Sequence, residues 1–159
     1  SSPRRQRQMC IRDSFDTLSE GMKSTLRSLR AVHSSRHVFG KSAAIPDDMA
    51  DLFGNADKAL QDAEHPVVIK HPLSGRETLY VNPGFTTRFV GWTEKESNSL
   101  LAFLYEHISR PEHTYRFQWS KGALAFWDNR ATWHLAVNDY PGETRLMHRI
   151  TIEGEPLEP

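Results

Sequence analysis

Several features that would assign this protein to a class are scarce in its 159 residues. It has one cysteine, Cys10, so no disulfide forms within the chain, and a lone thiol is typical of a reducing compartment. No apolar run approaches the roughly 18 residues that cross a bilayer, and no apolar stretch follows the charged start as in a signal peptide. We therefore expect a cytoplasmic protein with no membrane partner.

An excess of either charge is also lacking, because 20 Lys and Arg residues balance 20 Asp and Glu residues. A neutral domain has no field that attracts nucleic acid. The basic cluster Arg4-Arg5-Gln6-Arg7 has no aromatic residues interleaved with it, so we expect no nucleic-acid partner. What remains is an ordinary globular composition, 38% hydrophobic and 25% charged, which fits one domain with a hydrophobic core.

The first fourteen residues differ from the rest of the chain. They are polar, rich in Arg and Gln, and lack both helical and strand periodicity, so residues 1–14 are predicted to be a disordered or non-native tail. Two other interpretations stay open. The segment is an arm that packs in the full protein, or the string at 7–14 is translated adapter sequence fused to a gene fragment, with native sequence beginning near Phe15. The domain proper is placed at 15–159.

Helical spacing is clear in two places. Apolar residues recur every three or four positions over 16–32, with Asp16 or Thr17 as N-cap, and this predicts a first helix. Thr93, followed three residues later by Glu96, is a capping box that opens a second helix, which ends before Pro111. The stretch 34–65 between them is predicted to be a loop with one short helix at 48–61.

Short apolar or alternating runs dominate the second half of the chain. Tight turns, such as the one at 72–75, separate them, so they are predicted to be strands. Many short strands with two helices predict a mainly β fold with flanking helices, either a sandwich or a barrel. The runs are 67–69, 78–81, 115–119, 123–127, 131–137 and 145–152.

One histidine, His134, stands inside the apolar run at 131–137. A lone strand histidine is more often a hydrogen-bonded core residue than a metal ligand, so both roles stay open. Trp127 and Trp133 are expected in the core or a barrel wall. Asp128 is expected in a turn, where its hydrogen bonds orient a neighbour.

Two arginines share a face of the last predicted strand. Period two puts Arg145 and Arg149 on one side and Leu146, Ile150 and Ile152 on the core side. The simple interpretation is an exposed basic face. The functional one is an anion pocket, because Arg binds carboxylates in a bidentate manner.

Several motifs, in order, closely resemble the TauD/TfdA family of iron(II)- and 2-oxoglutarate-dependent dioxygenases. The likeness runs from about Phe15 to Ile152. Its strongest part is the segment 127–140 followed by Arg145-Leu146-Met147-His148-Arg149. The other segments that carry it are His71-Pro72-Leu73-Ser74-Gly75-Arg76, the run 80–88 and the helix end at 108–112.

The resemblance implies a double-stranded β-helix, the jelly roll of clavaminate synthase-like proteins, which binds iron(II) through two histidines and one carboxylate. His134 matches the distal iron-binding histidine, and Arg145 matches the arginine that pairs with 2-oxoglutarate. Arg149 matches a second arginine, near both the cosubstrate and the anionic group of the substrate. Phe85 is a candidate wall of the substrate pocket, with a core aromatic as the equal alternative. The strand period independently puts both arginines on one side.

The family's other two iron ligands come from a His-x-Asp or His-x-Glu motif, and none of the eight histidines here is followed two positions later by an acidic residue. We therefore expect the C-terminal portion of one dioxygenase domain, N-terminally incomplete and inactive alone.

The implied reaction hydroxylates a small anionic substrate, a sulfonate, alkyl sulfate or carboxylate, with dioxygen. 2-Oxoglutarate is decarboxylated to succinate in the process, in a taurine or sulfonate catabolic role. The alternative is a non-catalytic remnant that keeps an anion-binding site. A homo-oligomer stays open.

Overall fold

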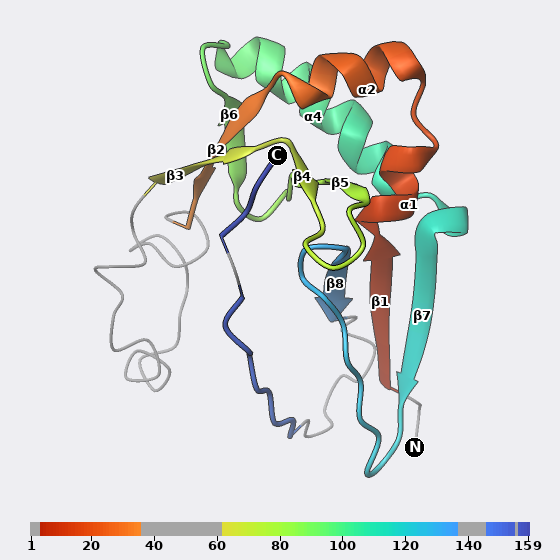
Figure 1. The fold of residues 1–159 in the computed structure, drawn as a ribbon. Helices are drawn as coiled ribbons and strands as arrows, with labels where there is room; N and C mark the ends of the chain where they lie inside the picture. The colour runs from red at the N-terminus through yellow and green to blue at the C-terminus, as the bar shows by residue number, and fades with distance from the viewer. Residues whose placement is uncertain (1–3, 36–61, 137–145, 155) are drawn as a thin grey trace.

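A three-stranded antiparallel sheet, sheet A, carries His134. Its order is β7 (Thr114–Trp119), β1 (Arg4–Cys10) and β8 (Thr132–Ala136), so β1 is hydrogen-bonded on both edges. The computed structural model describes residues 4–35, 62–136, 146–154 and 156–159. Figure 1 shows β1 and β7 running side by side, with β8 next to them.

A second antiparallel sheet, sheet B, has the order β3 (Asp62–Pro66), β2 (Arg30–Ser34) and β6 (Thr86–Phe89). A two-stranded hairpin of β4 (Val68–Lys70) and β5 (Glu77–Leu79) stands beside it. Most described elements are strands, and this confirms the mainly β fold with flanking helices. The turn of the β4–β5 hairpin places Gly75 at φ +66°, a left-handed conformation that favours glycine.

The helices are α1 (Ile11–Asp16), α2 (Glu20–Arg27) and α4 (Glu94–Ile108), with a 3-10 turn, η2 (Pro111–His113). In Figure 1, α2 and α4 lie across one end of the molecule. No helix in the described ranges is long and apolar enough to cross a membrane.

Helix α4 begins where the sequence predicts. The Thr93 hydroxyl accepts from the Glu96 backbone N–H, and the Glu96 carboxylate accepts from the Thr93 backbone N–H at 2.9 Å, so the capping box is confirmed. Its apolar face buries Leu101, Leu104 and Ile108 against the sheets.

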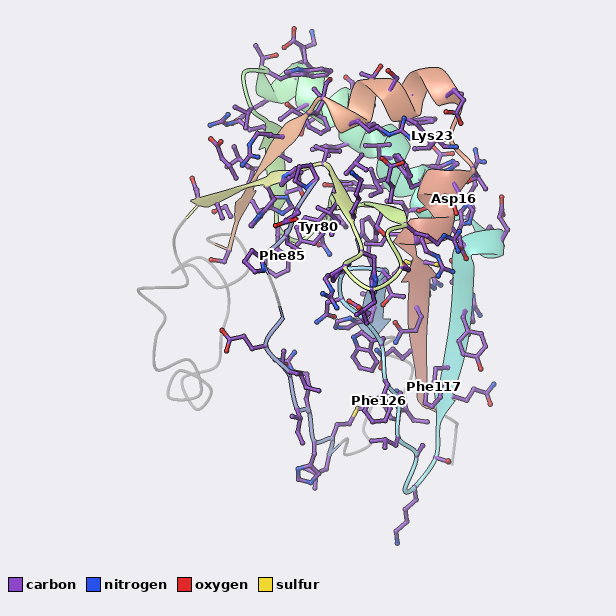
Figure 2. The ribbon with its side chains drawn as sticks, in the orientation of Figure 1. Asp16, Lys23, Tyr80, Phe85, Phe117 and Phe126 are labelled. Carbon is purple, nitrogen blue, oxygen red and sulfur yellow. The ribbon has the colours of Figure 1, made fainter. Side chains whose placement is uncertain are left out.

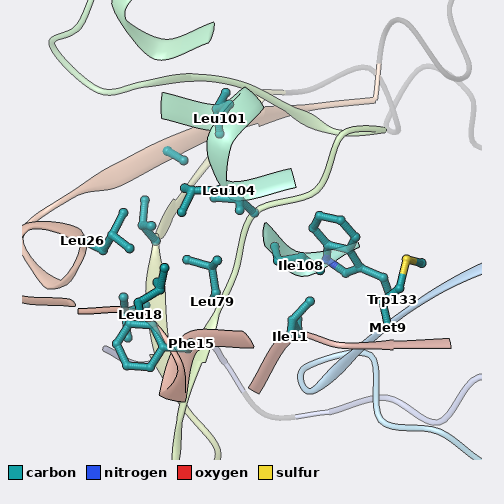
Figure 3. Close-up of a cluster of buried hydrophobic side chains, with 14 of the residues drawn as sticks. Met9, Ile11, Phe15, Leu18, Leu26, Leu79, Leu101, Leu104, Ile108 and Trp133 are labelled. Carbon is teal, nitrogen blue, oxygen red and sulfur yellow. The ribbon is translucent and has the colours of Figure 1, made fainter. Parts of the chain in front are cut away.

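The hydrophobic core lies where both sheets and the helices meet. Figure 3 shows Met9 of β1 and Trp133 of β8 reaching the same cluster as Phe15 of α1. Each of these side chains is at least nine-tenths buried, and Phe15 is 1% exposed. The remaining buried members include Ile11, Leu18, Leu26, Ala31, Val67, Val68, Leu79, Val81 and Phe89.

The prediction of a loose N-terminal tail at 1–14 is wrong for residues 4–14. Residues 4–10 form the central strand of sheet A, and α1 begins at Ile11. The segment lacks strand alternation because Gln6 is buried on one face while Met9 is buried on the other. The interpretation of this segment as non-native, and the boundary at 15, stay predictions.

The helix predicted over 16–32 is also wrong in extent. The chain turns after Asp16, a second helix starts behind the N-cap Ser19, and it ends at Arg27. The Ser19 hydroxyl accepts from the Met22 backbone N–H at 3.3 Å. Val32, which continues the helical spacing, is instead buried in β2.

Among the predicted strands, 67–69, 78–81, 115–119 and 131–137 correspond to β4, β5, β7 and β8. The strands predicted at 123–127 and 145–152 are wrong where the structure describes them, because 123–127 and 146–152 have no strand pairing. Within 34–65 the structure adds β3 from Asp62, and the short helix predicted at 48–61 lies outside the described residues.

Truncating Met9 tests whether β1 is a core strand. Met9 is 6% exposed, so Met9→Ala is expected to lower the free energy of unfolding by about 2–5 kcal/mol, measured by urea denaturation. Gln8→Ala is the control, since the Gln8 side chain projects from the opposite face of β1. A loose tail would instead leave the stability unchanged in the Met9 variant.

Candidate functional site

The turn before β8 brings two aromatic rings together. The Asp128 carbonyl accepts hydrogen bonds from the Ala131 N–H at 3.1 Å, the Thr132 N–H at 3.0 Å and the Thr132 hydroxyl at 2.8 Å. This closes residues 128–132 into a tight turn that starts β8. As a result the Trp127 ring packs against the His134 imidazole, with centroids 4.9 Å apart and planes at 47°.

The Asp128 carboxylate is the polar centre of this turn. It accepts from the Arg130 side chain at 3.0 and 2.9 Å, from the Arg130 N–H at 2.8 Å and from His71 Nε2 at 2.9 Å. The Arg130 guanidinium above all holds the pKa of Asp128 well below its usual range. The predicted turn role of Asp128 agrees with this geometry.

His134 lies on an exposed face of β8, and its pKa responds to a nearby positive charge. Burial first, and then the charge of Arg149, lowers the pKa of His134. A neutral imidazole has a free nitrogen lone pair for a metal or a hydrogen bond. The charge of Arg149 therefore acts on the His134 imidazole, and the roles of both residues stay predictions.

The segment that carries Arg149 differs from the predicted strand. Residues 146–154 have no regular structure, and Leu146, Ile150 and Ile152 are 80%, 91% and 84% exposed, so their predicted core positions are wrong. An extended segment buries its alternating apolar side chains only when a neighbouring strand covers them. Arg145 lies outside the described residues, so the shared face of the two arginines stays a prediction.

Sheet A places two further aromatic residues on the face from which His134 projects. The sequence pattern did not identify them as candidate site residues. His134 pairs with Gln8, and Gln8 pairs with Tyr115 on its other side, so these side chains project from the same face. Phe117, two positions after Tyr115, projects from it too. The alternation of aromatics in β7 was the signal that could have identified this wall.

Trp133 projects from the opposite face of β8. Its side chain is 8% exposed and its ring lies 5.8 Å from that of Tyr105. The predicted core role of Trp133 is therefore confirmed, whereas Trp127 is partly buried over His134.

Phe85 lies in a different part of the molecule. Figure 2 shows Tyr80 and Phe85 toward sheet B, and Phe117 and Phe126 toward the far end of sheet A. Phe85 is 37% exposed, and its carbonyl accepts from the Ser34 N–H at 2.8 Å. This exposure argues against a core position, and the role of Phe85 as a pocket wall stays a prediction.

Three rings gather in the same region. The His33 ring lies 5.2 Å from that of His65 and 5.4 Å from that of Tyr80. His33 Nε2 is buried with no hydrogen-bond partner in the described part of the chain. Burial lowers the pKa of His33 to about 4, and the nearby His65 adds to this effect.

The residues that the structure describes do not supply all the side-chain donors that an iron site requires. Among the residues that the structure describes, no three His, Cys, Asp or Glu side chains gather to hold a metal ion. His134 is a single imidazole donor, whereas a facial iron(II) site needs three converging donors. The described residues do not by themselves fit an iron centre.

Comparison with known proteins identifies the family. The family model "Taurine catabolism dioxygenase TauD, TfdA family" matches residues 12–151. The chain is 38% identical to an alkylsulfatase of Acinetobacter baylyi over 143 residues, which cover 89% of this chain and 45% of the relative. The chain belongs to the TauD/TfdA family.

Two further members extend the comparison. The chain is 37% identical to an alpha-ketoglutarate-dependent sulfate ester dioxygenase of Pseudomonas putida, over 89% of this chain and 47% of the relative. A taurine dioxygenase structure from Burkholderia xenovorans matches with TM-score 0.67 and 36% identity, over 84% of this chain and 40% of that one. The chain thus spans less than half the length of these TauD/TfdA relatives, and the resemblance seen in the sequence is confirmed.

The lowered pKa of the partly buried His33 leads us to expect a loss of stability in mild acid. Its folded-state pKa of about 4 lies below the value of about 6.5 in an unfolded chain, so its contribution is complete above about pH 6.5 and is lost as the pH falls toward 4. Urea unfolding of the chain across this range is expected to show the loss, and His33→Gln is expected to flatten it. An equal pH dependence in both proteins would contradict the assignment to His33.

Proposed function

We propose that this chain is the C-terminal part of an iron(II)- and 2-oxoglutarate-dependent dioxygenase that hydroxylates a sulfate ester or sulfonate. The observation that carries the proposal is the TauD/TfdA match over 12–151, and the effect of the Arg149 charge on His134 is consistent with it. His134 is assigned as one iron ligand and Arg145 as the partner of the far carboxylate of 2-oxoglutarate. Dioxygen is the second cosubstrate.

The substrate class follows from the relatives and from the charge of the site. The two relatives described above are named for alkyl sulfates and sulfate esters, whose anionic group suits a guanidinium. Arg149 is assigned to that group. Tyr115 and Phe117, on the His134 face, would line the path of an organic tail. Phe85, which lies toward sheet B, is assigned as a pocket wall from the family resemblance alone.

The jelly-roll architecture is part of the same proposal. The two antiparallel sheets are assigned as part of a double-stranded β-helix, whose other strands and the His-x-Asp iron ligands come from polypeptide outside this sequence. The exposed apolar side chains of 146–152 support this, because a completed roll would cover them. A cytoplasmic location is inferred from the single cysteine.

A second candidate, a non-catalytic anion-binding domain of the same fold, has one observation in its favour. The described residues include no cluster of three metal donors, while the positive charge of Arg149 acts on His134. Such a domain would bind 2-oxoglutarate or a sulfate ester without turnover.

Turnover by this chain alone is expected to be absent. One imidazole does not retain iron(II) against water, so the chain with added iron and ascorbate should release no more succinate from 2-oxoglutarate than a protein-free mixture. Succinate is measured by chromatography. Robust turnover would overturn the conclusion that the iron site is incomplete.

Anion binding by the chain is testable without iron. At about 100 times its Kd, 2-oxoglutarate is expected to stabilise the chain by about 2.7 kcal/mol, measured as a rise in Tm. Arg145→Ala is expected to abolish the rise. Arg88→Ala removes an exposed arginine of β6 and should leave the rise intact. A rise that persists without Arg145 would contradict its assignment.

A further inference from the structure

Asp128 stands between the two aromatic residues that meet at the start of β8. Trp127 precedes it directly, and His134 follows two residues into the strand. We propose that Asp128 is a positioning residue for His134: its carboxylate, bound to His71 and Arg130, holds the turn that packs the Trp127 ring on the imidazole. The proposal deepens the proposed function and rests on it for the role of His134.

The first support is the number of bonds that depend on this residue. The Asp128 carbonyl closes the turn through Ala131 and Thr132, and its carboxylate accepts four hydrogen bonds of 2.8 to 3.0 Å. Charge-assisted bonds of this kind are about twice as strong as neutral ones. The turn therefore has one dominant geometry.

The second support is the state of His71. Its Nδ1 lies 3.3 Å from the backbone N–H groups of Leu73 and Ser74, both of which donate to it. Nδ1 therefore acts as an acceptor, and Nε2 carries the hydrogen that it donates to Asp128 Oδ2. The turn at 72–75 thus selects the tautomer that binds the carboxylate.

His71 also connects the turn to a separate part of the fold. The His71 N–H donates to the Arg76 carbonyl at 2.9 Å, and the His71 carbonyl accepts from the Gly75 N–H at 2.8 Å, so His71 is held in the β4–β5 hairpin. That hairpin is anchored by Val68 and Leu79, which are buried in the core. Through His71, the core restrains the loop before β8.

The third support is the ring contact itself. Trp127 is held from one side by its indole N–H, which donates to Asn129 at 3.1 Å, and from the other by the His134 ring. A residue that binds through one ring nitrogen needs a restricted ring orientation, and neighbouring groups usually supply it. Here Trp127 restricts the imidazole, and Asp128 restricts Trp127.

The test compares His134 signals by NMR in chains labelled with 13C and 15N at histidine. In the wild type, the Trp127 ring should shift the His134 C–H protons upfield, and Trp127→Leu identifies that shift. Asp128→Asn is expected to lose it, because the amide has one acceptor oxygen in place of two and its N–H group faces donors of Arg130 or His71. Glu77→Gln is the matched control, since Glu77 also binds an arginine through both oxygens, at 2.7 Å each.

A second substitution at His71 distinguishes a positioning role of Asp128 from a general effect on the stability of the fold. In the double variant Asp128→Asn with His71→Gln, the Gln amide can turn its oxygen toward the Asn N–H, so the shift is expected to return. Should Asp128→Asn fail to fold, His71→Leu removes one anchor and should weaken the shift alone. Unchanged His134 signals in a folded Asp128→Asn or His71→Leu chain would overturn the proposal, whatever the change in Tm.

The measurement is independent of the proposed activity. It needs neither iron nor 2-oxoglutarate, so a chain that binds no anion still reports on Asp128. If the wild-type chain binds no anion but its His134 signals show the Trp127 ring shift, the result would count against the proposed function. The positioning role of Asp128 would still stand.

Discussion

Backbone hydrogen bonding by β1 is the constraint on which sheet A depends. In the described residues, β7 and β8 meet through β1 and not directly, since β1 bonds to both. The same strand delivers Met9 to the core and leads into α1, whose Ile11 N–H donates to the Ala131 carbonyl beside β8. Both the strand that carries His134 and the turn before it are therefore held by the first residues of the chain.

The His134 face combines a neutral imidazole, a nearby guanidinium and an aromatic wall. Partial desolvation and the charge of Arg149 lower the pKa of the imidazole. Tyr115 and Phe117 project from the same face two strands away. On the proposed function, this face would receive a ligand with an anionic head and an organic tail.

Parts of the fold could be predicted because their signals are local. The capping box at Thr93 depends on residues three positions apart, and the family motifs around His134 are contiguous. Strand β2 could not be separated from the preceding helix, because Val32 continues the spacing of Leu26 and Leu29. The alternation at 146–152 is strand-like, but a strand forms only where a neighbouring strand offers backbone hydrogen bonds, and residues 146–152 form no strand in the structure.

The sequence by itself determined the β-rich class through its short apolar runs and the family through its contiguous motifs, and the resemblance to that family marked His134 and the arginines as candidates. Only the tertiary structure decided that β1 is a central strand, that Trp133 points into the core, and that His71 reaches Asp128. His71 and Asp128 are 57 residues apart in the chain and 2.9 Å apart in space. Contacts between distant segments depend on how whole elements pack, and no local pattern in the chain encodes them.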